Sequence, residues 1–79
     1  MPLFYFHLSN STGWTCDTEG RELEGVQGAR EVAIQDARAL IAADVLEGRA
    51  ILMSSYVAIH DAEGEEVDRV GYDEVVTLT

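Results

Sequence analysis

Two histidines and one cysteine are the side chains best suited to metal binding or nucleophilic catalysis: His7, His60 and Cys16. Imidazole and thiolate groups ligate zinc, and a cysteine activated by a histidine is a nucleophile. However, the sequence has no Cys-x-x-Cys or His-x-x-x-His motif to bring ligands together. Cys16 also precedes Asp17 in an acidic chain, which disfavours the reactive thiolate. We therefore expect no metal site, no cofactor and no catalytic residue, and interpret Cys16 as a small buried or edge-strand hydrophobic residue.

Carboxylates are the other groups that could perform acid–base chemistry. Fifteen Asp and Glu residues offer many pairs. The densest cluster, Glu63, Glu65, Glu66 and Asp68, surrounds a predicted hairpin tip, where water screens the charges. The glycines of the sequence do not complete a phosphate-binding loop. The acidic cluster is therefore interpreted as a solvated turn.

The charge balance excludes two classes of partner. The chain has five basic residues, all arginine, and fifteen acidic residues, so its formal net charge is −10 at pH 7. Proteins that bind nucleic acid through its phosphates, or that dock on anionic lipid, need clustered basic residues. We expect no nucleic acid and no membrane as partner. An acidic protein can also mimic nucleic acid and occupy a basic protein, but these acids are scattered through turns and around a helix, and we rank that hypothesis last.

The sequence predicts one small soluble domain over residues 1–79. A chain of this length has room for a single core. Its first residues lack the basic region and the long apolar run of a signal peptide. The longest predicted helix carries too many charges to cross a bilayer, and one cysteine forms no internal disulfide. We therefore expect a cytoplasmic protein.

Apolar alternation predicts four strands. Leu3–Leu8 is dense in aromatic and apolar residues, and the turn residues Asn10–Gly13 lead to a second strand over Trp14–Asp17. The third strand is predicted over Ile51–His60 and the fourth over Glu66–Val70, where Gly71 ends it. The first two strands form a hairpin.

Two similar acidic turns punctuate this pattern. Asp17–Gly20 and Asp61–Gly64 both place Asp first and Gly last, as in a type I turn closed by a left-handed glycine. A short extended piece, Arg21–Leu23, follows the first turn. The C-terminal tail, residues 73–79, is predicted to form a short final turn or an edge strand through Val75, Val76 and Leu78.

The range Val26–Glu47 predicts the one long helix. It is rich in alanine, and its apolar residues recur at steps of three or four. Gly25 is only a fair N-cap, whereas Gly48 is a good left-handed C-terminal residue, beside which Arg49 can satisfy the last carbonyl groups. The apolar stripe of this helix consists of Val26, Ala29, Ala33, Ala37, Leu40 and Ile41.

These elements predict an α+β domain of order β-β-α-β-β, with a mostly antiparallel four-stranded sheet and the helix packed on one face. A right-handed crossover over the first strand places the first and third strands side by side in the centre, in the order second, first, third, fourth. The residues expected to face the helix are Phe4, Phe6, Leu8, Val57, Ile59 and either Val67 or Val70.

The opposite sheet face carries the residues that we consider functional. Side chains alternate along a strand, so this face displays Leu3, Tyr5, His7, Tyr56, Ala58 and His60. One helix cannot cover both faces, and an exposed face of this composition is typical of binding surfaces. The candidate binding residues are therefore Tyr5, His7, Tyr56 and His60.

His7 admits three interpretations. It is a half-buried histidine that hydrogen-bonds to a neighbouring strand or tyrosine, a contact residue at a homodimer or partner surface, or a catalytic or metal-binding group. The sequence favours the first interpretation and leaves the second open.

The chain resembles a family of short, uncharacterised bacterial proteins classed as a domain of unknown function. The resemblance lies in an aromatic strand that ends in His, Met1–Leu8, in the acidic turn Asp17–Gly20, in the helix start Ala29–Ala33 and in the late turn Asp61–Gly64. It implies a small stand-alone domain and no catalytic residue. The chain departs from the family pattern at Trp14, Cys16, Gly25 and Gly28.

The expected function is that of a non-enzymatic binding or protein-interaction module, with an unidentified protein or a second copy of the chain bound at the open sheet face. The alternative is a small-molecule-binding or enzymatic domain that uses the same Tyr/His face, with the ligand held against the Trp14 strand. A concave pocket beside a histidine of shifted pKa would favour the alternative.

Overall fold

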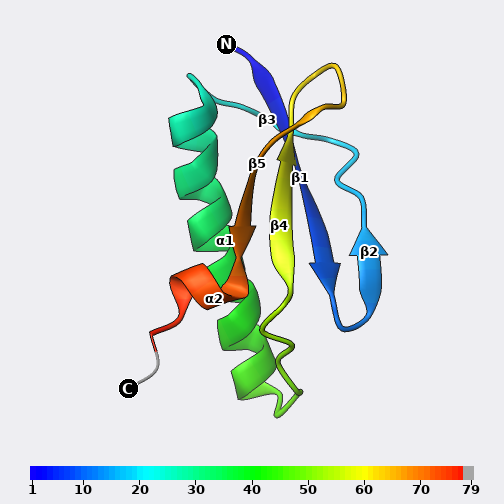
Figure 1. The fold of residues 1–79 in the computed structure, drawn as a ribbon, viewed down its shortest axis with the longest axis vertical. Helices are drawn as coiled ribbons and strands as arrows, with labels where there is room; N and C mark the ends of the chain where they lie inside the picture. Colours follow the sequence, from blue (N-terminus) through cyan, green and yellow to red (C-terminus); the bar gives the residue numbers. More distant parts are fainter. Residues whose placement is uncertain (78–79) are drawn as a thin grey trace.

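The computed structural model describes residues 1–77. It contains a sheet, one long helix that lies along one face of the sheet, and a second helix of a single turn (Figure 1). The elements are β1 (Leu3–Asn10), β2 (Gly13–Thr15), β3 (Arg21–Glu22), α1 (Val26–Leu46), β4 (Tyr56–His60), β5 (Glu66–Gly71) and α2 (Tyr72–Val75).

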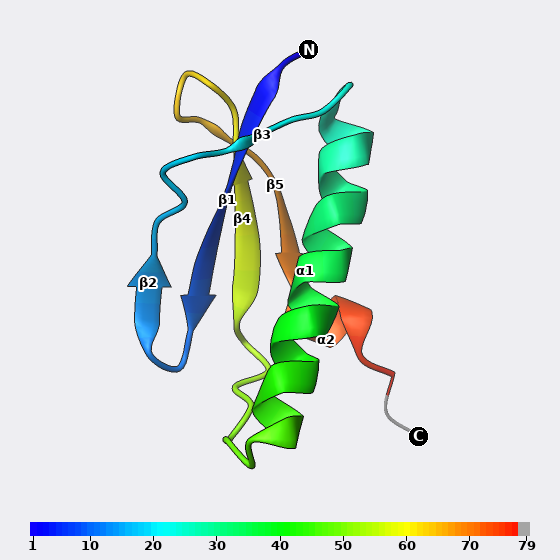
Figure 2. The ribbon, with the colours of Figure 1, turned by 180° about the vertical axis from the view of Figure 1, so that it is seen from behind.

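The sheet has the order β2-β1-β4-β5, and each of these pairs is antiparallel. This confirms the α+β class and the predicted strand order, with β1 and β4 in the centre. The structure adds a fifth strand, β3, which pairs with the start of β1 while β2 pairs with its end. Both short strands thus share one edge of β1. Figure 2, which shows the molecule from behind, places α1 in front of the sheet and along its β5 side.

The prediction for the third strand was too long. Residues 51–55 are not paired in the sheet, and β4 begins at Tyr56. The backbone turns here, because the Ser55 N–H donates to the Leu52 carbonyl (2.9 Å) and the Ser55 carbonyl accepts from the Tyr72 N–H (2.9 Å). Ile51 and Met53 nevertheless pack against the core. The spacing of these apolar residues therefore reflects their burial against the core and does not indicate strand pairing.

Other boundaries differ by one or two residues. The strand β2 ends at Thr15 instead of Asp17, α1 ends at Leu46 instead of Glu47, and β5 includes Gly71. The tail forms the short helix α2 rather than an edge strand, and Leu78 lies outside the described residues.

The C-terminus of α1 has the predicted glycine. Gly48 adopts φ +69°, and its N–H donates to the Val45 carbonyl (3.2 Å). The Arg49 side chain was expected to satisfy terminal carbonyl groups. Instead its backbone N–H donates to the Asp44 carbonyl (2.9 Å), and its guanidinium pairs with the Asp44 and Glu47 carboxylates. The Arg49 guanidinium therefore binds acidic side chains near the end of α1 and not the terminal carbonyl groups.

The core lies between α1 and one face of the sheet. Of the residues predicted to face the helix, Leu8 is partly buried, Val67 is exposed, and the others are buried: Phe4, Phe6, Val57, Ile59 and Val70. The helix contributes three alanines that are fully buried, Ala29, Ala33 and Ala37. Val26, predicted to join them, is 42% exposed because it starts the helix, beyond the core.

Tyr72 is a core residue that the sequence pattern did not indicate. It is 1% exposed and begins α2, directly after the last residue of β5. Burial raises the pKa of its hydroxyl, and the nearby Asp44 raises it further. Tyr72 closes the core because the chain turns back at Gly71, which only the tertiary structure reveals.

Within residues 1–77, no helix combines the length and the apolar character needed to cross a membrane.

Candidate functional site

The four candidate residues lie on the sheet face that α1 leaves open. Their neighbours along the strands, Phe4 and Phe6 in β1 and Val57 and Ile59 in β4, point into the core, so alternation directs the candidates to the other side. The register pairs Tyr5 with His60, and Ser9 with Tyr56. Tyr5 and His60 are thus direct cross-strand neighbours, whereas Tyr56 lies further along the face. We call the surface formed by Tyr5, His7, Trp14, Tyr56 and His60 the open face.

Three of the candidates and a tryptophan form one aromatic cluster. The rings of His7 and His60 meet edge to face with centroids 4.5 Å apart, and Tyr5 stacks on His7 at 6.4 Å. Trp14 adds a ring 5.4 Å from His7 and 6.4 Å from His60. Trp14 is 50% exposed. The cluster therefore has a solvent-accessible indole at the edge of the sheet.

Trp14 was missing from the predicted site residues. Its place on this face follows from the β1–β2 register, which pairs Trp14 with Ser9. Ser9 has the same strand parity as Tyr5 and His7. The register of the β1–β2 hairpin would have identified Trp14 as a residue of this face. The turn residues alone do not specify that register.

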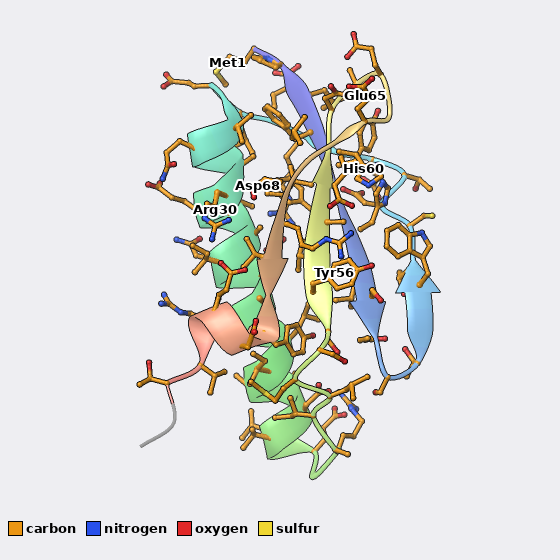
Figure 3. The ribbon with its side chains drawn as sticks, in the orientation of Figure 1. Met1, Arg30, Tyr56, His60, Glu65 and Asp68 are labelled. Atoms are coloured by element: carbon orange, nitrogen blue, oxygen red, sulfur yellow. The ribbon has the colours of Figure 1, made fainter. Side chains whose placement is uncertain are left out.

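Tyr56 lies apart from this cluster and is covered by an arginine. The guanidinium carbon of Arg69 stands 3.8 Å from the Tyr56 ring centroid. Glu66 holds that guanidinium with two hydrogen bonds of 2.9 Å. Because of this ion pair, the pKa of Glu66 lies below its ordinary value. One side of the Tyr56 ring is thus occupied by the chain itself (Figure 3).

His7 is held by the loop that follows β2. The Asp17 N–H donates to Nδ1 of His7 (2.9 Å), so Nδ1 carries no proton and the neutral ring is protonated at Nε2. The half-buried histidine expected from the sequence is present, but its partner is a loop backbone and not a neighbouring strand or tyrosine. Burial lowers the pKa of His7, and the charge of His60 lowers it further, against the opposing effect of Asp17.

We expect His7 to titrate below the ordinary histidine value of about 6.5. The measurement is a pH titration of the imidazole carbon-bound protons by NMR, with the urea-unfolded chain as reference. The unfolded chain then binds the proton more tightly, so the free energy of unfolding should rise with pH between the folded and the unfolded pKa of His7. A folded value at or above the unfolded reference would show that the attraction of Asp17 outweighs burial and the charge of His60, and would contradict this prediction.

His60 has a buried nitrogen without a partner. Among the described residues, its Nε2 atom finds no hydrogen-bonding group. The Glu66 Oε1 atom is 3.9 Å away, too far for a hydrogen bond. A register shift in β5 beside His60 pairs Glu66 with it. His60 therefore links the other rings of the aromatic cluster to the Glu66–Arg69 pair.

Cys16 is not the buried or edge-strand residue that we expected. It is exposed and follows the last residue of β2. Its Sγ atom accepts a hydrogen bond from the Trp14 indole N–H (3.0 Å). The described residues contain no group of three or more His, Cys, Asp or Glu side chains placed to hold a metal ion.

The aromatic cluster is a platform more than a pocket. Among the hollows on the surface of residues 1–77, three have volumes of about 390, 520 and 370 Å³, and His7, Trp14 and His60 line none of these three. Tyr56 lines the third hollow, together with Arg69. The first lies on the helix side of β1, between Asp17 and Asp36, and the second between the β1–β2 turn and the end of α1. The aromatic cluster thus presents open ring surfaces and does not line any of these three hollows.

A family model described as "Domain of unknown function (DUF6894)" matches residues 3–73. The chain belongs to this family. The match confirms the resemblance to a family of unknown function, and it covers both strands that carry the candidate residues. No curated protein and no solved structure matches the chain. Membership in the DUF6894 family therefore assigns neither an activity nor a partner, and functional arguments rest on the chain's own geometry.

Proposed function

We propose that the protein is a non-enzymatic interaction module that binds another protein through the open face. The observation that supports this proposal is the aromatic cluster, which joins two histidines, a tyrosine and a half-exposed tryptophan on the side of the sheet that α1 does not cover. Tyrosine and tryptophan are enriched at protein interfaces because they combine a large apolar surface with a polar atom. The proposal includes a cytoplasmic location.

The alternative, a small-molecule-binding or enzymatic domain on the same face, has less support. Small ligands are usually held in concave sites that bury most of their surface. The three hollows described above leave out the histidine pair. The lowered pKa of His7 has a local explanation in its burial and in the nearby charge of His60.

The test is affinity capture from extract of the native cell with three forms of the protein. The wild type is compared with Trp14→Ala/Tyr56→Ala and with a control, Val45→Ala/Leu46→Ala, that removes apolar side chains 63% and 87% exposed at the end of α1. We expect the open-face variant to lose a partner that the control retains, while both keep the circular dichroism spectrum of the wild type. Retention by both variants, or loss only in the control, would refute the proposed surface.

Light scattering tests whether the partner is a second copy. The chain has a mass of 8.7 kDa, so a homodimer has twice that mass. A dimer that dissociates in Tyr5→Ala/Tyr56→Ala would identify self-association through the open face. A monomeric wild type leaves a different protein as the partner.

A further inference from the structure

We infer that the open face binds an arginine-containing, positively charged segment of another protein. This inference rests on the proposed function and specifies the chemistry of the partner. It combines three observations. The acidic residues without an arginine partner gather near this face, the chain binds its own arginines through rings and carboxylates, and an aromatic cluster adjoins the acidic segments.

Most arginines of the chain have their charge neutralised by carboxylates of the same chain. Four of the five make ion pairs with carboxylates of the same chain: Arg21, Arg30, Arg49 and Arg69. The carboxylates in these pairs are Asp36, Asp44, Glu47, Glu66, Asp68 and Glu74. The formal net charge is −10, and most of this surplus therefore resides on the nine acidic residues outside these ion pairs.

Those other acidic residues gather at one end of the sheet. Seven of them lie in two segments, residues 17–24 and residues 61–65: Asp17, Glu19, Glu22, Glu24, Asp61, Glu63 and Glu65. Both segments lie at the end of the sheet where Met1 begins the chain, one along the outer edge of β1 and the other at the end of β4 (Figure 1).

The aromatic cluster adjoins this acidic end. His60 directly precedes Asp61, and His7 accepts a hydrogen bond from the Asp17 backbone. Figure 3 shows His60 just below Glu65. The rings are thus flanked by negative charge on both sides, and a cation that lies over them gains attraction from the ring faces and from the flanking carboxylates.

The chain itself shows how this face holds a guanidinium. Arg69 lies over Tyr56 while Glu66 accepts both of its hydrogen bonds. On the other side of the sheet, Arg21 lies 5.2 Å from the Phe6 ring centroid and pairs with Asp36. Arginine suits this combination of ring and carboxylate better than lysine, because its planar group stacks and donates several hydrogen bonds at once.

A second copy of the chain does not match this chemistry. It brings a further net charge of −10, and its arginines are mostly engaged in their own ion pairs. Repulsion between two such chains opposes self-association. A basic segment of a different protein has the complementary charge.

The test uses a synthetic peptide of alternating arginine and glycine, with a lysine–glycine peptide of equal length and charge for comparison. The single tryptophan provides one indole N–H signal by NMR, and it lies in the proposed site. We expect the arginine peptide to shift this signal and those of His7 and His60, to bind more tightly than the lysine peptide, and to bind about fivefold more weakly to Trp14→Ala. Shifts confined to other surfaces would overturn the inference.

Two variants with the same change in net charge separate a specific site from general attraction. Glu22→Gln/Glu65→Gln removes an exposed acid from each flanking segment, with Glu22 paired to Leu3 on the side of the sheet that carries Tyr5. Glu31→Gln/Asp73→Asn removes two exposed acids from α1 and α2. We expect the first to weaken peptide binding about tenfold and the second less than about twofold. Equal weakening in both would show that binding follows net charge alone and would overturn the inference.

The capture experiment distinguishes this failure from failure of the proposed function. If the peptides do not bind the open face but the native partner still depends on Trp14 and Tyr56, the chemical class of the partner is wrong and the interaction function stands. If capture is also independent of these residues, the proposed function fails as well.

Discussion

Replacement of Phe4 by alanine is expected to remove most of the stability of the domain. Phe4 is 4% exposed and belongs to the core between the sheet and α1. Truncation of a buried phenylalanine costs about 3–5 kcal/mol, and a domain of this size is stabilised by about 5 kcal/mol. The cavity cannot close easily, because α1 already contributes its smallest side chains here, the buried Ala29, Ala33 and Ala37.

Urea denaturation followed by circular dichroism measures this effect. The Phe4→Ala protein should be partly unfolded without urea. The control is Leu46→Ala, which removes a large apolar side chain that is 87% exposed and should change the free energy of unfolding by less than about 0.5 kcal/mol. A cooperative transition of Phe4→Ala close to that of the wild type would contradict the assignment of Phe4 to the core.

Replacement of Asp17 by alanine is expected to lower the free energy of unfolding by about 2–3 kcal/mol, because it removes several hydrogen bonds to a charged acceptor. The carboxylate accepts the backbone N–H groups of Phe6 (3.1 Å), Glu19 (3.1 Å) and Gly20 (3.2 Å). The first of these bonds joins the loop to the outer edge of β1, between β2 and β3, where no strand pairs with this edge. Without it, the Phe6 N–H loses its acceptor.

Asp61 provides a matched control within the same chain. It begins the second Asp-x-Glu-Gly turn, and its carboxylate accepts only local N–H groups, from Glu63 and Glu65, each at 3.0 Å. Asp61→Ala should therefore cost less than Asp17→Ala in parallel urea denaturations. Equal losses would show that the bond from Asp17 to β1 adds nothing.

The contribution of Asp17 should depend on pH. Burial by itself raises the pKa of Asp17, but the hydrogen bonds from Phe6, Gly20 and Glu19 and the charge of Arg21 outweigh it and hold the pKa below its ordinary value. The stabilisation is therefore complete above the unfolded pKa of about 3.9 and is lost as the pH falls through the lower folded pKa. The stability difference between wild type and Asp17→Ala should shrink in that acid range, and a difference that grew would contradict the shift.

The two acidic turns show how far local sequence can predict. Both were expected to end in a left-handed glycine, and Gly20 and Gly64 do adopt φ of +73° and +85°. The sequence treats the turns as equivalent, because their first and last residues have the same types. Only the fold places Gly20 so close to β1 that a Cβ atom would lie 3.0 Å from the Phe4 carbonyl oxygen, and only the fold gives Asp17 a partner in β1.

Local residue patterns were sufficient to predict the class of the fold, the strand order and the two faces of the central strands. Alternation is a local property of an extended chain, so the buried set around Phe4 and Ile59 and the opposite set around Tyr5 and His60 follow from the residue types. The long helix was predicted in the same way, from its alanine content and from apolar residues that recur every three or four positions. A buried segment outside the sheet can have the same apolar spacing as a strand. For this reason residues 51–55 were wrongly predicted to belong to a strand.

Which of these residues contact one another depends on how the elements pack in three dimensions. Registers between strands and the course of loops bring together residues far apart in the chain, so no local pattern specifies them. The β1–β2 register places Trp14 beside His7. The pairing of β4 with β5 brings Arg69 over the Tyr56 ring. Likewise, the backbone of Asp17 reaches His7 only because its loop runs along the edge of β1. These contacts, rather than the residue types alone, determine the arrangement of side chains on the open face.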